Sequence, residues 1–261
     1  MLMDSKAWKY IVCAVAIAVL GGAGGVVAVS LIASKTYQFK YEHHDNRERE
    51  LKVTGSARKR IHSDVALWHF QLTSDAKTLA DAYKILKDAD AKARAFLEKH
   101  GFKADEIAAH AVETKTNYRV EFKGWSGTEQ HETRDAESYT LTRGYTITTP
   151  RVESVAVPSG AVTELIEQGV KVVSCAPEYY YSKIADLKVE MIGEASRDAR
   201  ARADQVVNNA GCAVVEVRHA RMGVLQITQP NSTAVSDSGI FDTSTIEKDV
   251  TAVVALTLGI K

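Results

Sequence analysis

The stretch DVALWHFQLTSDAKTLADAY, Asp64–Tyr83, changes its periodicity midway and thereby decides the class of fold. Over its first half, side chains alternate between two sides of an extended chain. One side is apolar and holds Ala66, Trp68, Phe70 and Leu72. The other side holds Val65, Leu67, His69 and Gln71. This period of two predicts a strand over 64–73 with one buried face.

The second half of the stretch opens a helical pattern over 78–100. Apolar residues recur there at spacings of three and four, which places them on one face: Leu79, Ala82, Tyr83, Leu86, Ala89, Ala93, Phe96 and Leu97. Gly101 follows the last of them, as expected of a residue that ends a helix. An amphipathic helix therefore follows the strand, with its apolar stripe toward a core.

Working outward, both patterns recur along the chain. Alternating segments predict further strands at 50–57, 107–122, 138–149, 171–181, 213–227 and 250–260. A second long helix is predicted over 183–210, and its stripe consists of Ile184, Leu187, Met191, Ala195, Ala199, Ala203 and Val206. Gly211 ends it, and its alanines allow it to lie close to a sheet. A shorter helix is expected to open at Pro150, to break or kink at Pro158 and to resume over 161–168.

This order of elements predicts an α+β, or mixed α/β, domain over 50–261. Its two long helices are expected to pack on largely antiparallel sheets. A polar juxtamembrane linker over 38–49 is expected to precede the domain.

The N-terminal segment is expected to cross a membrane once. Residues 10–33, YIVCAVAIAVLGGAGGVVAVSLIA, hold no charged side chain. As a helix they are about 36 Å long, which is enough for a hydrocarbon core of about 30 Å. Trp8 and Tyr37 flank the run, as aromatic residues do at membrane interfaces. We interpret residues 1–37 as a signal anchor formed by one transmembrane helix.

A cleaved signal peptide is the competing interpretation, with Ala28-Val29-Ser30 as its cleavage site. The apolar run exceeds the about 7–15 residues of a typical signal peptide, which favours retention. A long domain behind an N-terminal anchor is usually exported. We therefore expect a single-pass protein of the cell inner membrane, with its C-terminal domain in the periplasm or outside the cell. Gly21 and Gly25 have the GxxxG spacing that lets membrane helices associate, although membrane helices also simply tolerate glycine.

Charge and motifs restrict the classes of function. Lys plus Arg number 33 and Asp plus Glu number 33, so the formal net charge is zero. A nucleic-acid partner is not expected, because phosphate binding favours a basic excess. The chain contains no GxSxG, no HExxH, no phosphate-loop lysine and no GxGxxG after a strand. We therefore expect no enzyme, no cofactor and no metal site.

Three residues outside the anchor remain candidates for a special role. Cys175 and Cys212 could form a disulfide in an exported compartment. Their expected positions, in mid-strand and at the start of another strand, are offset along the sheet, so two buried thiols are the alternative. Trp125 stands in a polar, charged loop, where it would contact a partner or a membrane, or else pack locally over the hairpin.

Four segments resemble the SIMPL domain family, also called DUF541, which includes bacterial periplasmic proteins of the oxidative-stress-defence type. They are VTGSA at Val53–Ala57, the stretch Asp64–Tyr83, EASRDARARADQVVNNAG at Glu194–Gly211, and the final polar loop with the VTAVVALTL strand. The resemblance covers residues 50–261 and rests on pattern and order. It implies an envelope location and self-assembly, and it implies no catalytic residues. The interruption at Pro158, the charged loop around Trp125 and the retained anchor depart from the family's pattern.

We therefore expect a membrane-anchored, extracytoplasmic SIMPL-domain protein that acts non-enzymatically, by interaction or self-assembly in the cell envelope, in stress defence. Its expected partners are the lipid bilayer through residues 10–33, further copies of itself in a homo-oligomer, and an unknown envelope protein. Two alternatives stay open. A small-ligand or cell-wall-binding module would show a concave aromatic pocket. An unrecognised envelope hydrolase or redox enzyme would show a pocket where His or Cys meets a carboxylate.

Overall fold

The computed structural model describes residues 49–122 and 132–261. Within these ranges, no helix is both long and apolar enough to cross a membrane. The predicted span over 10–33, with Gly21 and Gly25, lies outside the described residues, and so does Trp125.

The chain divides into two compact units. Among the described residues, the first consists of Arg49–Ser56, Ile192–Gly223 and Val253–Lys261. The second consists of Ala57–Met191 and Val224–Ala252. Each unit is described by itself below.

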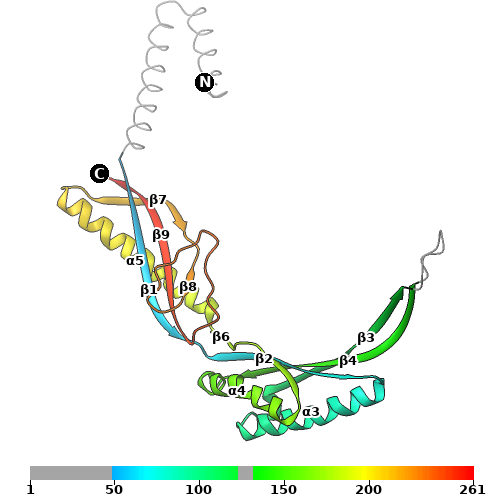
Figure 1. Cartoon of the computed structure of the whole chain (residues 1–261). Coiled ribbons are helices and arrows are strands. Elements are labelled where there is room, and N and C mark those ends of the chain that lie inside the picture. The colour runs from blue at the N-terminus through cyan, green and yellow to red at the C-terminus, as the bar shows by residue number, and fades with distance from the viewer. Residues whose placement is uncertain (1–48, 123–131) are drawn as a thin grey trace, which may run out of the picture. The chain divides into compact units, whose positions relative to one another are not determined.

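An antiparallel sheet of five strands forms the frame of the second unit (Figure 1). Its strands are β2 (Val65–Ala76), β3 (Ile107–Phe122), β4 (Glu132–Thr149), β5 (Lys171–Ser174) and β6 (Glu178–Tyr180). Their order is β3-β4-β2-β5, and β6 also pairs with β2. Every one of these pairs is antiparallel. The mixed α/β architecture with antiparallel sheets is therefore confirmed.

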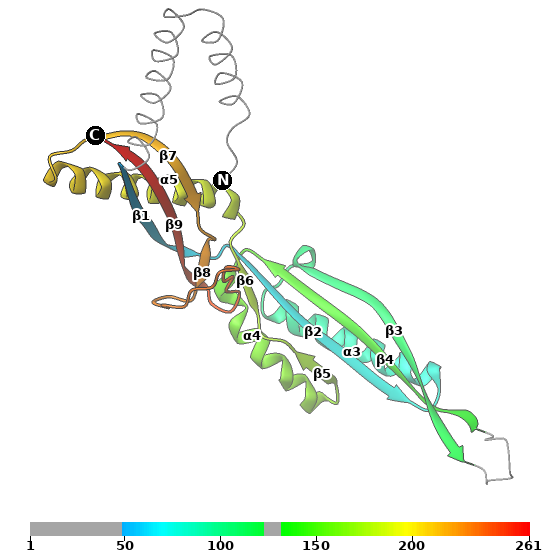
Figure 2. The ribbon, with the colours of Figure 1, turned by 90° about the horizontal axis from the view of Figure 1, so that it is seen from above.

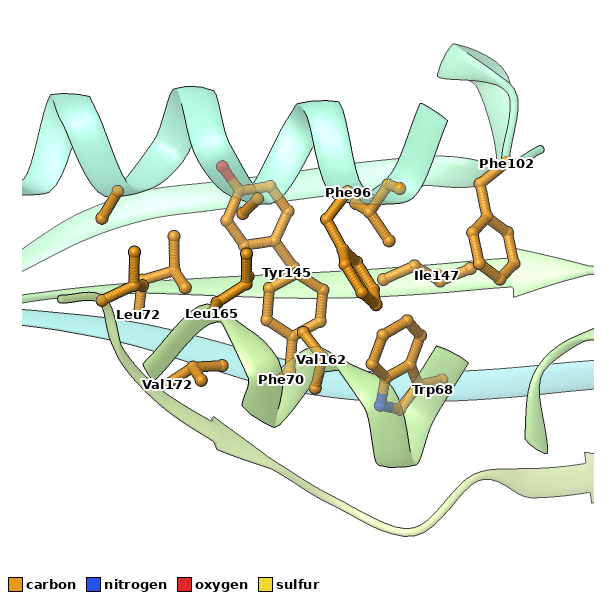
Figure 3. Packing of buried hydrophobic residues seen from close by; sticks show 14 of the residues in the cluster. Trp68, Phe70, Leu72, Phe96, Phe102, Tyr145, Ile147, Val162, Leu165 and Val172 are labelled. Carbon is orange, nitrogen blue, oxygen red and sulfur yellow. The ribbon is translucent and has the colours of Figure 1, made fainter. Parts of the chain in front are cut away.

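The apolar side of β2 packs against helix α3 (Leu79–Lys99) and forms the core of this unit (Figure 3). Ala66, Trp68, Phe70 and Leu72 are at most 3% exposed, as the alternation predicted. The ring of Phe70 stacks on that of Tyr145 from β4, with centroids 4.9 Å apart. Full burial of large apolar side chains stabilises the folded state by about 1.5–3 kcal/mol each.

Helix α3 is followed by its predicted cap, Gly101, and Thr78 caps its first turn. Thr78 Oγ1 accepts a hydrogen bond from the backbone nitrogen of Asp81 at 3.2 Å, which satisfies one free donor of the first turn. Gly101 follows the helix with a left-handed φ of 78°. The predicted stripe is wrong at Leu79 and Tyr83, which are 47% and 56% exposed. The buried stripe runs from Ala82 to Leu97 and faces the sheet. The side chains of Leu79 and Tyr83 lie beside this stripe.

The segment after β4 contributes to the same core through three short helical pieces. They are η2 (Val152–Ser154), α4 (Ala156–Ala161) and η3 (Val162–Gln168). No helix begins at Pro150, and Pro158 lies buried inside α4, so both predictions for these prolines were wrong. Pro158 is tolerated because a nitrogen in the first turn has no helical acceptor to lose. Gly169 ends the segment with a left-handed φ of 78°.

Strands β3 and β4 continue past the rest of their sheet as a two-stranded ribbon (Figures 1 and 2). The last pair between β2 and β4 joins Ala76 to Tyr139. Beyond it, β3 and β4 stay paired with each other as far as Phe122 and Glu132. The loop predicted over 123–135 is therefore strand from Glu132 onward.

A second sheet contains β1 (Glu50–His62), β7 (Val214–Met222), β8 (Gln226–Thr228) and β9 (Glu247–Ile260). Its order is β1-β9-β7, and β8 also pairs with β9. Helix α5 spans Ile184–Asn209 and ends before Gly211, whose φ is 69°.

In the first unit, α5 lies close against β1 because small residues meet there. Ala195, Ala199 and Ala203 on α5 are fully buried. Facing them is Gly55 of β1, where an added Cβ would lie 2.2 Å from the backbone nitrogen of Ala199. The alanine run predicted this close approach. The stripe continues through Val207, which is 3% exposed, and the predicted Val206 points outward with 50% of its surface exposed.

Two of the predicted strands are each divided in the structure. The segment 171–181 forms β5 and β6, which are separated around Pro177, a residue with no N–H for a sheet. The segment 213–227 forms β7 and β8, which are separated around Gly223. The strands β5 and β6 both pair with β2, and the strands β7 and β8 both pair with β9.

Candidate functional site

Four polar side chains form a row across the open face of the five-stranded sheet, opposite α3. His69 on β2 and Thr146 on β4 are directly opposite each other, and such pairs share a face. Cys175 extends the pairing of β5 by one residue, since its backbone nitrogen donates to the carbonyl oxygen of His69 at 2.9 Å. His110 on β3 lies on the other side of Thr146. We call His110, Thr146, His69 and Cys175 the His–Thr–His–Cys row.

One hydroxyl group joins the two histidines of the row. Thr146 Oγ1 lies 2.9 Å from His69 Nδ1 and 2.8 Å from His110 Nε2. A hydroxyl can donate to one ring nitrogen and accept from another. The bridge therefore orients both imidazoles, and it leaves Nε2 of His69 available for a further contact.

The row lines a shallow concavity of about 230 Å³. Val173 is its exposed apolar side chain, whereas Phe70 and Tyr145 belong to its lining although their rings are buried on the α3 side of the sheet. Gly144 makes room for His110, because an added Cβ there would lie 3.3 Å from the ring. No carboxylate lines this concavity, so it lacks the acidic partner that we expected of a hydrolase or redox pocket.

A polar network on the α3 side of the sheet holds the side chain of Tyr145. The hydroxyl of Tyr145 donates to Asp90 of α3, which also pairs with Arg94 and Arg143, each at 3.0 Å. Burial raises the pKa of Tyr145 to about 12, and the hydrogen bond to Asp90 adds to this effect. Burial alone would raise the pKa of Asp90. The hydrogen bonds from Tyr145 and Arg94 and the charge of Arg143 outweigh it, so this pKa is lowered.

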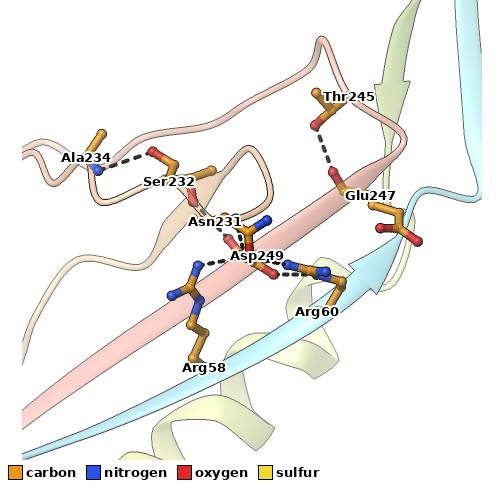
Figure 4. A network of polar contacts seen from close by, with 9 residues as sticks. Arg58, Arg60, Asn231, Ser232, Ala234, Thr245, Glu247 and Asp249 are labelled. Carbon is orange, nitrogen blue, oxygen red and sulfur yellow. Dashed lines mark hydrogen bonds and ion pairs between the residues drawn. The ribbon is translucent and has the colours of Figure 1, made fainter.

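A second polar network surrounds Asp249 of β9, whose side chain is 4% exposed (Figure 4). Its carboxylate accepts hydrogen bonds from Arg60 Nε at 2.9 Å, Arg58 Nη2 at 2.7 Å and the backbone nitrogen of Asn231 at 2.8 Å. These donors, with Arg60 first, hold the pKa of Asp249 well below its usual range. The network joins β1 and β9 to the polar loop that precedes β9, and we interpret it as structural.

An apolar strip lies on β7, which is one of the two edge strands of the second sheet among the described residues. We call its residues, Val215, Val217 and Met222, the β7 strip. Val217 pairs with Leu258 and Met222 with Val254, so each pair shares a face. Leu258 and Val254 are 0% and 2% exposed, whereas Val217 and Met222 are 55% and 62% exposed. The buried face of β9 therefore continues onto β7, where no described residue covers it.

The structure places the two predicted cysteines on different units. Both are free thiols. Cys175 belongs to the second unit and is exposed, so the interpretation of both as buried thiols was wrong. Cys212 belongs to the first unit and is half-buried between α5 and β7. Among the described residues, no three His, Cys, Asp or Glu side chains are grouped so as to hold a metal ion.

Sequence reasoning identified His69 only as a single histidine on the polar side of its strand. Its link to His110 depends on the order β3-β4-β2, which periodicity does not reveal. The alternation in SYTLTRGYTITT, residues 138–149, was the available signal, since it places Thr146 and Tyr145 on opposite faces.

Over residues 49–122 and 132–261, these elements define an α+β architecture with two sheets and two long helices. The chain belongs to the SIMPL family, described as a protein of unknown function (DUF541), whose family model matches residues 51–257. The resemblance seen in the sequence is thereby confirmed.

No curated protein matches the chain. The designed protein Foldit4 matches at 8% identity with a TM-score of 0.21, over 42% of this chain and 93% of that one. A hydantoinase/carbamoylase family amidase from Burkholderia ambifaria matches at 10% identity with a TM-score of 0.21, and 46% of this chain spans 29% of the amidase. The regulatory subunit of aspartate kinase from Thermus thermophilus matches at 12% identity with a TM-score of 0.17, over 79% and 88% of the two chains. At these scores the similarities carry no argument about function.

Proposed function

We propose that this SIMPL-family protein acts without catalysis, by self-association of its domain in the cell envelope. In this proposal the N-terminal segment anchors it as a single-pass protein of the inner membrane. The domain lies on the extracytoplasmic side and contributes to stress defence as part of an assembly. The β7 strip is the observation that carries the proposal.

Two properties of β7 favour pairing with another chain. Among the described residues β7 is an edge strand, and an edge presents unpaired backbone donors and acceptors. Its strip also exposes large apolar side chains, with Val215 56% and Met222 62% exposed. Contiguous exposed apolar surface on a soluble domain is typical of an interaction site.

A second copy of the chain is the occupant that fits this edge. Two β7 strands that pair antiparallel about a two-fold axis would join their sheets through backbone hydrogen bonds. The same arrangement would place Val217 and Met222 of each copy against the other's apolar face. One contact would then pair the free backbone groups of β7 and cover its apolar side chains.

The anchoring part of the proposal rests on the sequence. Residues 10–33 hold no charge, and the first strand begins at Glu50, directly after the predicted linker. An anchor of this kind would bring copies of the domain together in the plane of a membrane, where linked sites gain a high effective concentration.

The experiment compares native masses in detergent. It uses the full-length protein, a form that begins at Glu50, and the full-length double variant Val217→Lys/Met222→Lys. Two buried lysines would be costly at an apolar contact. We expect an oligomer from both unaltered forms and a smaller species from the double variant.

Val189→Lys provides the matched control, because Val189 is 73% exposed on α5 and lies outside the β7 strip. It is expected to leave the native mass unchanged. Oligomers that persist in the double variant would exclude β7 as the contact. Assembly of the full-length form alone would assign the association to the N-terminal segment, and monomers throughout would refute self-association.

A further inference from the structure

We propose that Cys175 is a reactive thiol that exchanges with small-molecule disulfides, with His69 as the acceptor of its proton. This site lies on the five-stranded sheet of the second unit. It goes beyond self-association and does not depend on it.

The backbone brings the thiol and the imidazole together. The nitrogen of Cys175 donates to the carbonyl oxygen of His69 at 2.9 Å, so the two residues are cross-strand neighbours. Side chains of directly opposite residues have Cβ atoms about 4.5–5.5 Å apart and point to the same face. Cys175 is exposed, as a thiol that meets a dissolved reactant must be.

Thr146 and His110 orient the imidazole ring of His69. Its Nδ1 is engaged by Thr146 Oγ1 at 2.9 Å, and the same hydroxyl is engaged by His110 at 2.8 Å. A base whose ring is oriented by a third group is the arrangement that activates nucleophiles in many unrelated sites. Nε2 of His69 is the nitrogen that remains for the thiol. Thr146 and His110 are therefore positioning residues.

The concavity beside the thiol indicates the class of ligand. Its volume of about 230 Å³ suits a small molecule, and Val173 presents an exposed apolar side chain to it. No acidic side chain lines it, so a thiolate that leaves the site is not repelled by a neighbouring carboxylate. A low-molecular-weight disulfide with an apolar arm satisfies these conditions.

The exchange step balances without any further reactant. Nε2 of His69 takes the proton of Cys175, and the thiolate attacks one sulfur of the disulfide. The S–S bond of the reactant breaks as a mixed disulfide forms on Cys175. The other half leaves as a thiolate and takes the proton from the imidazolium. Cys175 is oxidised, and the leaving half is reduced to a thiol.

Cys212 is the internal reference for a test. Its Sγ lies 3.7 Å from the carbonyl oxygen of Ala210, and it is half-buried at the end of α5. The full-length protein in detergent is treated with dithiodipyridine, a small uncharged aromatic disulfide. Modification of each cysteine is followed over time by peptide mass mapping, at several pH values.

We expect Cys175 to react at least about tenfold faster than Cys212. This factor is smaller than the rate enhancement of about 10²–10⁴-fold that a positioned base typically contributes. Greater exposure could by itself favour Cys175, so the variant His69→Gln is decisive. It should slow Cys175 about tenfold, leave Cys212 unchanged and make the pH profiles of the two thiols parallel. The control His219→Gln removes an exposed histidine from β7 and should change neither rate.

An unchanged rate and pH profile of Cys175 in a folded His69→Gln protein would overturn the proposal. If that variant does not fold, Thr146→Val decides, because it keeps the shape of the side chain and removes the bridging hydroxyl. A slower reaction at Cys175 alone would then support the proposal, and an unchanged reaction would refute it.

Discussion

Gly55 of β1 lies directly against Ala199 of α5, so close that a Cβ on the glycine would be 2.2 Å from the backbone nitrogen of the alanine. The carbonyl oxygen of Ala195 would be only 2.3 Å away. Both neighbours are backbone atoms, which cannot rotate aside. The contact therefore sets the distance between helix and sheet in the first unit.

Replacement of this glycine should loosen the first unit. We expect Gly55→Ala to lower the free energy of unfolding by about 1–3 kcal/mol or more, because overpacking forces the backbone apart. Urea denaturation followed by circular dichroism measures the change. Gly193→Ala on α5 is the matched control, since nothing lies within 4 Å of its added Cβ. It should raise stability by about 0.5–1 kcal/mol, as alanine favours a helix over glycine. Equal effects from the two variants would contradict the packing interpretation.

The network beneath the concavity predicts a late-titrating tyrosine. The pKa of Tyr145 is about 12 and so lies above the ordinary tyrosine value of 10.0. The folded state therefore favours the neutral phenol. This stabilisation is complete below about pH 10 and is lost as the pH rises through about 12. Spectrophotometric titration should show one tyrosinate absent from the Tyr145→Phe variant, ionising last. A wild-type curve without this late step would count against the network.

The network around Asp249 predicts sensitivity to acid. A carboxyl group whose pKa is lowered in the folded state stabilises the protein above its unfolded value, and the benefit is lost as the pH falls. Asp249→Asn should lower the free energy of unfolding at neutral pH by about 1.5–3 kcal/mol, the range for charged hydrogen bonds. The gap to wild type should shrink near about pH 3, below the usual aspartate range. Urea midpoints at both pH values test this. Asp237→Asn changes an exposed carboxylate in the same loop and should have little effect at either pH.

The ribbon of β3 and β4 should open independently of its sheet. Beyond Tyr139 the two strands have no third strand among the described residues, and an isolated hairpin is at most marginally stable in water. In hydrogen exchange, the amides of Tyr118 to Phe122 should exchange far faster than those of Trp68 to Leu72 in β2. Comparable protection of both segments would show that another element or a partner covers the ribbon.

Periodicity predicted the elements that are amphipathic and long. Trp68 and its alternating neighbours predicted the buried face of β2, and the spacing from Ala82 to Leu97 predicted α3. It failed where a single residue interrupts a strand, as at Pro177, because both flanking pieces still read as one extended segment. It also failed at the start of β4, where the polar residues Glu132 to Asp135 show no alternation of apolar and polar side chains.

The candidate site was less accessible from the sequence. His69, His110 and Cys175 are far apart in the chain and come together only through the order of the strands. Local pattern assigns each residue to a face, but it does not choose the neighbouring strand. The β7 strip escaped notice for a related reason, because Val217 and Met222 follow the pattern of core residues. Only the position of β7 at an edge leaves them exposed.

The central position of β9 in its sheet has a consequence for synthesis of the chain. In that sheet β1 has β9 as its neighbour, and β9 begins only at Glu247, so it leaves the ribosome long after β1. The strand β1 therefore has no partner until β9 has been synthesised. The five-stranded sheet is formed by β2 to β6 and can close earlier, when residue 180 has emerged. Nascent chains should accordingly pass through a stage in which one sheet is complete and the other still lacks its central strand, open to chaperones and to misplaced partners.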